Sequence, residues 1–215
     1  MKICLLIFIN VFFVSRVCGK KDSTFFFNEF SLSVNQTNLT NDRANDRFGF
    51  GGGIYRSLTT KKKNNLVFGF EFNRSSQFVK EMYVGHYGYS TDLTYYINCL
   101  SVPLTLGLNF GNKTKFIIEP GIFMDLSLGA KRKGTMHDYS PNQNNQPTYK
   151  EYNFSQGVGI SNPNFGPSLG IGLKIPISKQ ELIIRTDYKL GLRELSGEVD
   201  QIYNCYLRLM IGLKI

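Results

Sequence analysis

The chain has 215 residues, 25 of them lysine or arginine and 16 aspartate or glutamate, which gives a formal net charge of +9. This length leaves room for one or two domains, and no break in the sequence pattern requires the second. Four cysteines and two histidines exclude a disulfide framework and a metal site with recognisable ligand spacing.

Residues 1–19 have the features of a secretory signal. Lys2 precedes the apolar run ICLLIFINVFFV, and Val17 and Gly19 stand at the small-residue positions of a signal-peptidase site. The run is too short for a helix that crosses a bilayer, which needs about 20 residues. We predict a signal removed after Gly19 and one mature domain at 20–215; a retained helix anchor or a lipoprotein signal at Cys18 is the alternative. Export argues against nucleic acid as a partner and favours lipid head groups or surface glycans.

Alternation of apolar and polar residues recurs along the rest of the chain, without a convincing 3.6-residue period. A typical strand of a soluble domain has about 5 or 6 residues, whereas a transmembrane strand needs about 9 to 11. The alternating segments are closer to the second length. In chain order they are 25–34, 47–56, 66–74, 98–110, 114–129, 165–177, 181–192 and 204–215.

The connections between these segments alternate in length. The odd ones are long and rich in Asn, Asp and Ser, whereas the even ones, SLTTKKKNN, GNK and SKQ, are shorter. In an up-and-down barrel, odd and even connections emerge at opposite ends, and outer-membrane barrels have short periplasmic turns and long external loops. We therefore predict an all-β fold, an eight-stranded antiparallel up-and-down transmembrane β-barrel. A soluble lipocalin-like ligand-binding barrel, whose strands also alternate, is the alternative.

If the apolar faces meet lipid, the third predicted strand points Phe70 outward and Glu71 inward. An eight-stranded barrel is only wide enough to be filled by its own side chains, and an isolated buried charge is costly. We expect the inward charges to neutralise one another in a plugged lumen; a conducting channel is the alternative. The predicted lumen charge network contains Glu29, Glu71, Glu119, Asp125, Lys174, Arg185, Asp187, Lys189, Arg208 and Lys214.

The polar stretch HDYSPNQNNQPTYKEYNF at 137–154 is expected to be a surface loop. Its functional interpretation is a contact surface, in which tyrosines stack on a glycan or another protein and cations hold lipopolysaccharide phosphates at the rim. The residues of this predicted surface are Lys131, Arg132, Lys133, Tyr139, Tyr149 and Tyr152.

Catalysis is not expected from this composition. His137, Asp138 and Ser140 are the residue types of a hydrolase or acyltransferase, but neighbours in one loop do not make a triad, because the groups must converge in space. We predict no enzyme activity, no cofactor and no metal.

Four segments are similar to a known family. The chain resembles the PorT-like outer-membrane β-barrel proteins common in Bacteroidetes, which are eight-stranded barrels with an N-terminal signal peptide. The resemblance implies the fold and an outer-membrane location but no activity. It rests on CLSVPLTL at 99–106, EPGIFMDLSLGAK at 119–131, NFGPSLGIGLKI at 164–175 and TDYKLGL at 186–192.

Three positions depart from the family pattern. Ser101 stands where the family often has an acidic residue, Asp187 where it often has Arg, and Ile215 where such barrels usually end in an aromatic. The first two imply a rearranged charge network in the lumen.

These observations predict a monomeric outer-membrane protein, surrounded by outer-membrane lipid, with a non-catalytic surface-binding or structural role in the cell envelope. The candidate partners are lipopolysaccharide, a surface glycan or other envelope proteins. An accessory role in protein secretion or envelope assembly is the alternative, and the sequence does not choose between them.

Overall fold

The structure, a computed structural model, describes residues 26–38, 44–61, 64–84, 87–141, 146, 148–160, 163–193 and 205–215. The predicted signal at 1–19 lies outside these residues. Within these ranges the elements are strands joined by turns and bends, and no helix there is long and apolar enough to cross a membrane.

Every predicted strand overlaps an observed one, and one further strand, β6, lies in the segment expected to be a loop. The strands are β1 (Glu29–Asn38), β2 (Ala44–Lys61), β3 (Asn64–Val84), β4 (Gly88–Phe110), β5 (Lys115–Asp138), β6 (Lys150–Val158), β7 (Asn164–Ile177), β8 (Gln180–Lys189) and β9 (Cys205–Lys214).

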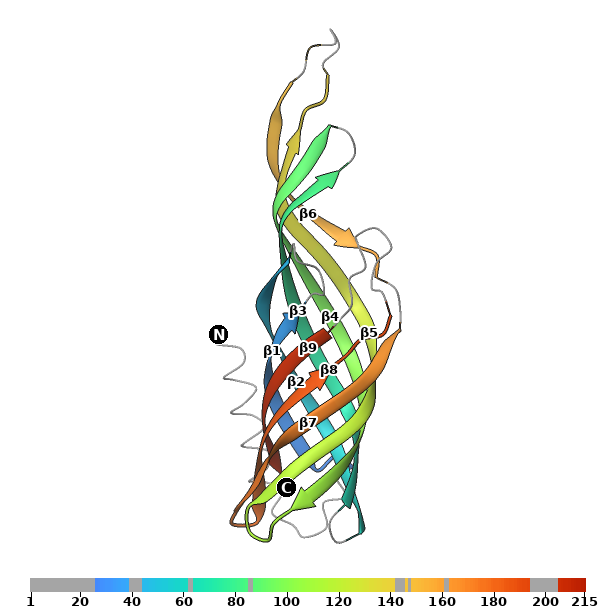
Figure 1. The fold of residues 1–215 in the computed structure, drawn as a ribbon, viewed down its shortest axis with the longest axis vertical. Coiled ribbons are helices and arrows are strands. Elements are labelled where there is room, and N and C mark those ends of the chain that lie inside the picture. Colours follow the sequence, from blue (N-terminus) through green and yellow to red (C-terminus); the bar gives the residue numbers. More distant parts are fainter. Residues whose placement is uncertain are drawn as a thin grey trace.

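Eight of these strands close into a ring. The sheet order is β4-β3-β2-β1-β9-β8-β7-β5-β6, and an additional pairing joins β4 to β5. Each strand except β6 therefore pairs with a neighbour on both sides, and every pairing is antiparallel. Closure leaves the barrel without an unpaired edge. The predicted eight-stranded antiparallel barrel is confirmed, and Figure 1 shows its strands inclined around a common axis.

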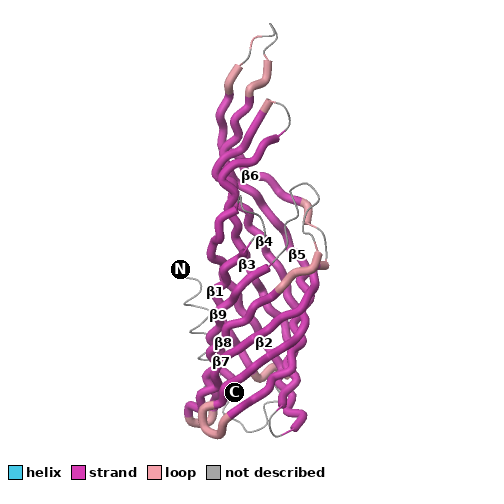
Figure 2. Tube along the Cα trace, in the orientation of Figure 1, coloured by secondary structure: helices cyan, strands magenta, loops and turns pink. Residues whose placement is uncertain are grey.

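Three neighbouring strands continue far beyond the ring. β3, β4 and β5 have 21, 23 and 24 residues, so β5 spans about 80 Å at roughly 3.3 Å per residue. β6 pairs with the far part of β5, from Lys150 opposite Asp138 to Val158 opposite Ala130. Together they form a twisted extension at one end of the barrel, while the C-terminus lies at the other end (Figures 1 and 2). The expectation of long loops at 75–97 and 130–164 was therefore wrong for most of these residues, which lie in β3, β4, β5 and β6.

The extension has a small core of its own. Val79, Leu93 and Tyr95 are buried in it, and Phe154 and Val158 of β6 pack against them. Gly134 lies opposite Phe154, and a Cβ atom there would come within 2.9 Å of a Leu93 methyl carbon and 2.8 Å of the Thr91 carbonyl oxygen. A larger residue at 134 would push Leu93 out of this core. The extension is thus a packed sheet.

The two faces of the barrel wall are chemically opposite. Leu207, Leu209 and Ile211 of β9 are 46%, 53% and 57% exposed, whereas Arg208 and Met210 between them are each 2% exposed. The same alternation holds on β7, where Leu169 and Ile171 are exposed. In soluble barrels the exposed face is polar. Here an apolar belt surrounds an interior that contains charges.

Candidate functional site

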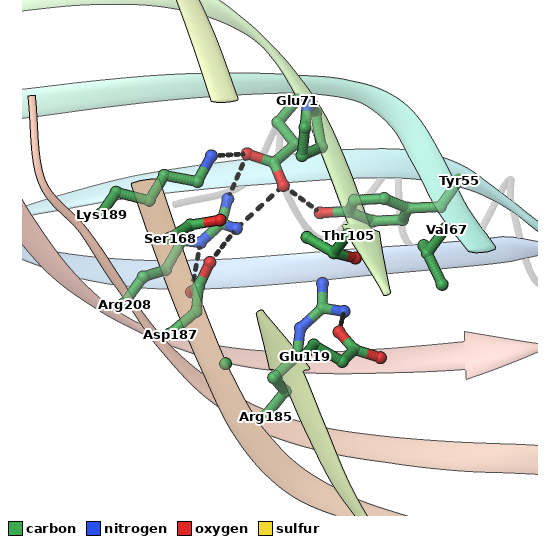
Figure 3. A pocket seen from close by; sticks show the side chains of 12 residues that line it. Tyr55, Val67, Glu71, Thr105, Glu119, Ser168, Arg185, Asp187, Lys189 and Arg208 are labelled. Atoms are coloured by element: carbon green, nitrogen blue, oxygen red, sulfur yellow. Dashed lines mark hydrogen bonds and ion pairs between the residues drawn. The ribbon is translucent and has the colours of Figure 1, made fainter. Parts of the chain in front are cut away.

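Arg208 of β9 is the centre of the lumen. Its Nη1 and Nη2 atoms donate to the Glu71 carboxylate at 2.6 and 2.8 Å, and its Nε and Nη2 atoms donate to the Asp187 carboxylate at 2.9 and 2.6 Å. Figure 3 shows the guanidinium between the two carboxylates. Such two-point contacts are stronger and more directional than a single ion pair. They tie β9 to β8 beside it and to β3 across the lumen.

The Glu71 carboxylate also accepts hydrogen bonds from Lys189 and Tyr55. Lys189 Nζ donates to its Oε2 atom at 2.5 Å and to Ser101 Oγ at 2.9 Å. The Tyr55 hydroxyl donates to Glu71 Oε1 at 3.0 Å and accepts from Ser31 Oγ at 3.2 Å. Ser101 is therefore a neutral partner of Lys189, and Asp187 is a partner of Arg208.

A second cluster lies beside the first. Arg185 Nη1 makes an ion pair with Glu119, and Lys174 Nζ lies 3.9 Å from the same carboxylate. The Arg185 guanidinium also lies 5.4 Å from the centre of the Tyr55 ring, so Tyr55 contacts both clusters.

The other predicted lumen residues lie near these clusters or at the barrel ends. Asp125 accepts a hydrogen bond from the Tyr206 hydroxyl at 3.4 Å, and Glu29 lies inward on β1 with 2% of its surface exposed. Lys214 is half-buried, with its Nζ 3.9 Å from Glu181 at the end away from the extension. The structure thus places nine of the ten predicted residues in the barrel interior and brings seven of them into the two clusters.

Little space remains between the two clusters. The cavity that both line has a volume of about 10 Å³, which is close to the room that one water molecule needs. Tyr55, Glu71, Glu119, Arg185 and Arg208 contribute to its wall. This part of the lumen holds cross-strand ion pairs and has no space for a solute.

Aromatic lumen residues were missed from sequence. Lys189 Nζ lies 5.1 Å from the Phe123 ring centre and 5.6 Å from that of Tyr206, which suits a cation–π contact. Tyr55 and Tyr206 are each 1% exposed. The sequence carries a signal for Tyr206, which stands two residues before Arg208 and so lies on the same face of β9.

The histidine of the suspected catalytic group has other partners. The His137 ring is hydrogen-bonded through Nε2 to Thr91 Oγ1 at 3.0 Å and through Nδ1 to the Tyr149 hydroxyl at 2.8 Å. Ser140 Oγ instead donates to Asp138 at 2.5 Å. The arrangement therefore lacks the nucleophile-to-base contact that a triad needs. In the described part of the chain, no group of three or more His, Cys, Asp or Glu residues is placed to hold a metal ion.

Aromatic rings gather at the far end of the extension. Tyr89 stacks on His137 with 4.5 Å between ring centres, Tyr139 lies 5.1 Å from Tyr149, and Tyr83 lies 6.3 Å from Tyr89. Tyr83, Tyr139 and Tyr149 are 75%, 44% and 51% exposed. The Tyr149 hydroxyl donates to Glu151 Oε2 at 2.7 Å, and this hydrogen bond raises the pKa of Tyr149 to about 12. We call Tyr83, Tyr89, His137, Tyr139 and Tyr149 the tip cluster.

The predicted contact surface is divided by strand geometry. Tyr139 and Tyr149 belong to the tip cluster, whereas Tyr152 lies on the opposite face of β6, because successive strand residues point to opposite sides. Lys131 and Lys133 lie on the outer wall near the barrel, but Arg132 between them points to the other face and donates to Gln156 Oε1 at 2.9 Å. The three adjacent cations therefore do not form one site.

No protein-family model matches the sequence, and no curated protein matches it significantly. The fold is similar to that of Ail, the attachment invasion locus protein of Yersinia pestis, whose structure was solved with the heparin analogue sucrose octasulfate. The two sequences are 13% identical, and the TM-score is 0.42. The match covers 87% of this chain and 97% of the Ail chain. Neisserial surface protein A has 10% identity, a TM-score of 0.45 and coverage of 87% and 95%. A major outer membrane protein of Thermus thermophilus has 12% identity, a TM-score of 0.41 and coverage of 86% and 97%. These likenesses concern the fold only.

Proposed function

We propose that the protein is an integral outer-membrane barrel that a signal peptide directs for export. The apolar belt supports this proposal, because a closed ring of strands with exposed leucine, isoleucine and phenylalanine satisfies its backbone internally and suits a hydrocarbon environment. The test is expression in a Gram-negative host followed by membrane fractionation. A folded membrane barrel stays in the membrane fraction and migrates differently on gels before and after heating. Recovery of the protein from the soluble periplasm, without a change in gel mobility on heating, would contradict the proposal.

The lumen has a structural role in this proposal. The network around Arg208 joins β3, β8 and β9 across the barrel, and the small cavity beside it leaves no path for ions or solutes at that level. These observations support a plugged, non-conducting lumen, and the absence of catalysis stays a prediction.

The function that the geometry supports best is non-catalytic surface binding by the tip cluster. Tyrosine supplies a large flat contact area with a polar hydroxyl at low cost in conformational entropy, which suits recognition of a glycan or a protein surface. In the tip cluster the rings are exposed and already ordered: Tyr139 and Tyr149 lie in contact, and Thr91 and Tyr149 fix the His137 ring. This pre-ordered aromatic surface is the observation that carries the proposal.

The matched experiment compares two faces of the same hairpin. Tyr139→Ala with Tyr149→Ala removes exposed rings from the tip cluster, and Tyr152→Ala removes a ring of similar exposure, 49% against 51% for Tyr149, from the opposite face. Anchoring aromatics contribute about 2 kcal/mol or more to binding, so the double variant is expected to lose about 30-fold or more in affinity for the glycan or envelope protein identified by array and crosslinking. Equal losses for Tyr152→Ala would refute a role specific to the tip cluster.

Membership of the PorT-like family stays a prediction, and so does the accessory role in secretion or envelope assembly. A deletion strain separates the two functions. A secretion defect that the Tyr139→Ala, Tyr149→Ala protein restores in full would favour the accessory role over surface binding.

A further inference from the structure

Four cations follow the outer wall where the apolar belt ends. On β3, Arg74 is the next outward residue after Phe72; on β5, Lys131 and Lys133 follow Leu128. Arg47 of β2 is exposed and places its guanidinium over the ring of Phe78, which shares one face of β3 with Arg74. β2, β3, β4 and β5 are consecutive neighbours in the sheet. Arg47, Arg74, Lys131 and Lys133, which we call the basic wall, thus occupy one side of the barrel, at the boundary between the belt and the extension.

Strand register places these cations in rows with aromatic rings. Phe78 of β3 lies opposite Thr94 of β4, which lies opposite Lys133, and the Arg47 guanidinium lies 4.5 Å from the Phe78 ring centre. In the next row, Tyr96 lies opposite Lys131.

The Tyr96 ring lies between two of the cations. Its centre is 4.8 Å from the Arg74 guanidinium and 5.9 Å from Lys133 Nζ. The ring therefore holds two positive charges near one another on the outer surface. Contacts of this kind are worth about 0.5 to 1 kcal/mol at exposed sites.

The basic wall differs from the lumen in its counter-charges. Inside, Glu71 and Asp187 lie at ion-pair distance from Arg208, and Glu119 from Arg185. Outside, among the residues whose side chains the structure describes, no ion pair joins a carboxylate to any of the four wall cations. Lys131 and Lys133 are exposed. The carboxylates whose side chains are described do not balance these charges.

We propose that the basic wall binds the phosphate groups of lipid head groups in the leaflet from which the extension projects. This inference rests on the proposed membrane location, because it is the lipid that brings the phosphates to this height. The belt positions the acyl chains below, and Arg74, Lys131 and Lys133 stand further along β3 and β5, where head groups begin. Arg74 offers a planar two-point donor, and Lys131 and Lys133 add mobile point charges, a combination suited to phosphate. The rings of Tyr96 and Phe78 provide a flat apolar surface for the head group beside them.

The experiment is native mass spectrometry of the full folded chain in neutral maltoside detergent, titrated with diphosphoryl lipid A, monophosphoryl lipid A and a neutral glycolipid. Affinity is expected to fall from the diphosphoryl to the monophosphoryl to the neutral lipid. Each cation near an anionic head group contributes about 1 kcal/mol, so Lys131→Gln with Lys133→Gln is expected to weaken diphosphoryl lipid binding about 30-fold. Arg74→Gln provides a second variant on another strand.

The control removes the same charge from the other end of the barrel. Lys113→Gln with Lys179→Gln neutralises two exposed lysines of the short turns and is expected to leave lipid affinity unchanged. Equal weakening by both double variants, or equal binding of the neutral glycolipid, would overturn the proposal. Displacement of the lipid by equimolar inorganic phosphate would also overturn it, because the site would then take a free anion. Heat-dependent gel mobility, measured on the same samples, reports barrel folding and so separates failure of this inference from failure of the membrane proposal.

Discussion

Replacing Arg208 with methionine removes the cation that joins both buried carboxylates at the centre of the lumen. Arg208 is 2% exposed and makes four charge-assisted hydrogen bonds of 2.9 Å or less, two to Glu71 and two to Asp187. In the variant, Glu71 keeps Lys189 and Tyr55, but Asp187 loses the cation that the structure places on it.

The expected cost follows from that burial. Breaking a buried ion pair by removing one partner destabilises a protein by about 3 to 5 kcal/mol, because a buried charge is left uncompensated. Lys115 and Glu181 form a 2.8 Å pair with side chains 36% and 25% exposed, and exposed pairs contribute about 0 to 1 kcal/mol. Lys115→Gln is therefore the control. Asp187→Asn added to Arg208→Met removes the orphaned charge, so the double variant is expected to be more stable than Arg208→Met.

The assay is reversible urea unfolding in phospholipid vesicles, followed by circular dichroism because the chain has no tryptophan, with gel mobility as the second readout. A loss below about 1 kcal/mol for Arg208→Met would contradict the reasoning, since it would make this pair equivalent to an exposed one. A double variant less stable than Arg208→Met would contradict the assignment of the cost to Asp187.

Three further predictions follow from individual contacts. Gly134→Ala is expected to cost about 1 to 3 kcal/mol in the extension by overpacking against Leu93, raising hydrogen exchange in β5 and β6 while the barrel keeps its gel shift. The Tyr149 phenol is expected to ionise near pH 12. Glu151→Gln is expected to bring that pKa back toward the ordinary value near 10, because the carboxylate that accepts the phenol proton is gone. NMR of labelled tyrosine measures the Tyr149 pKa in the parent protein and in the variant. Planar bilayers containing the protein are expected to show no unitary conductance, and a steady open channel would contradict the plugged lumen.

The barrel was predictable because its wall has a strict chemical period. Each inward residue meets the lumen and each outward residue meets an apolar environment, so Phe70 and Glu71 cannot exchange faces without cost. The same period assigned Arg208 and Asp187 to the interior. The pairing of Arg208 with Glu71 was not predictable, because it depends on how far the side chains of β9 and β3 reach across the closed ring.

The extension escaped prediction because its pattern is weak and its register is shifted. β4 and β5 slip between Thr91 and Thr94 and again between Asn98 and Cys99. Asp92, with a φ of 54°, lies in the first shift, in a conformation that aspartate tolerates better than most residues. These bulges set the register in which Tyr89 lies opposite His137.

The predicted contact surface was divided because it was drawn from residues adjacent in sequence. Lys131, Arg132 and Lys133 form a run in the sequence, but successive residues of a strand point to opposite faces.

The charges inside and outside the barrel should respond differently to salt. The ten predicted lumen groups carry five negative and five positive formal charges, so the net charge of +9 lies on other residues, the basic wall among them. Raising ionic strength from 0.1 to 1 M shortens the screening length from about 10 to about 3 Å, which weakens exposed interactions far more than buried ones. Diphosphoryl lipid A is therefore expected to dissociate from the wall over this range while the urea midpoint loses little of the contribution from Arg208. Loss of both together would show that water and ions enter the lumen, and retention of the lipid would show that apolar contacts, and not the four cations, hold it.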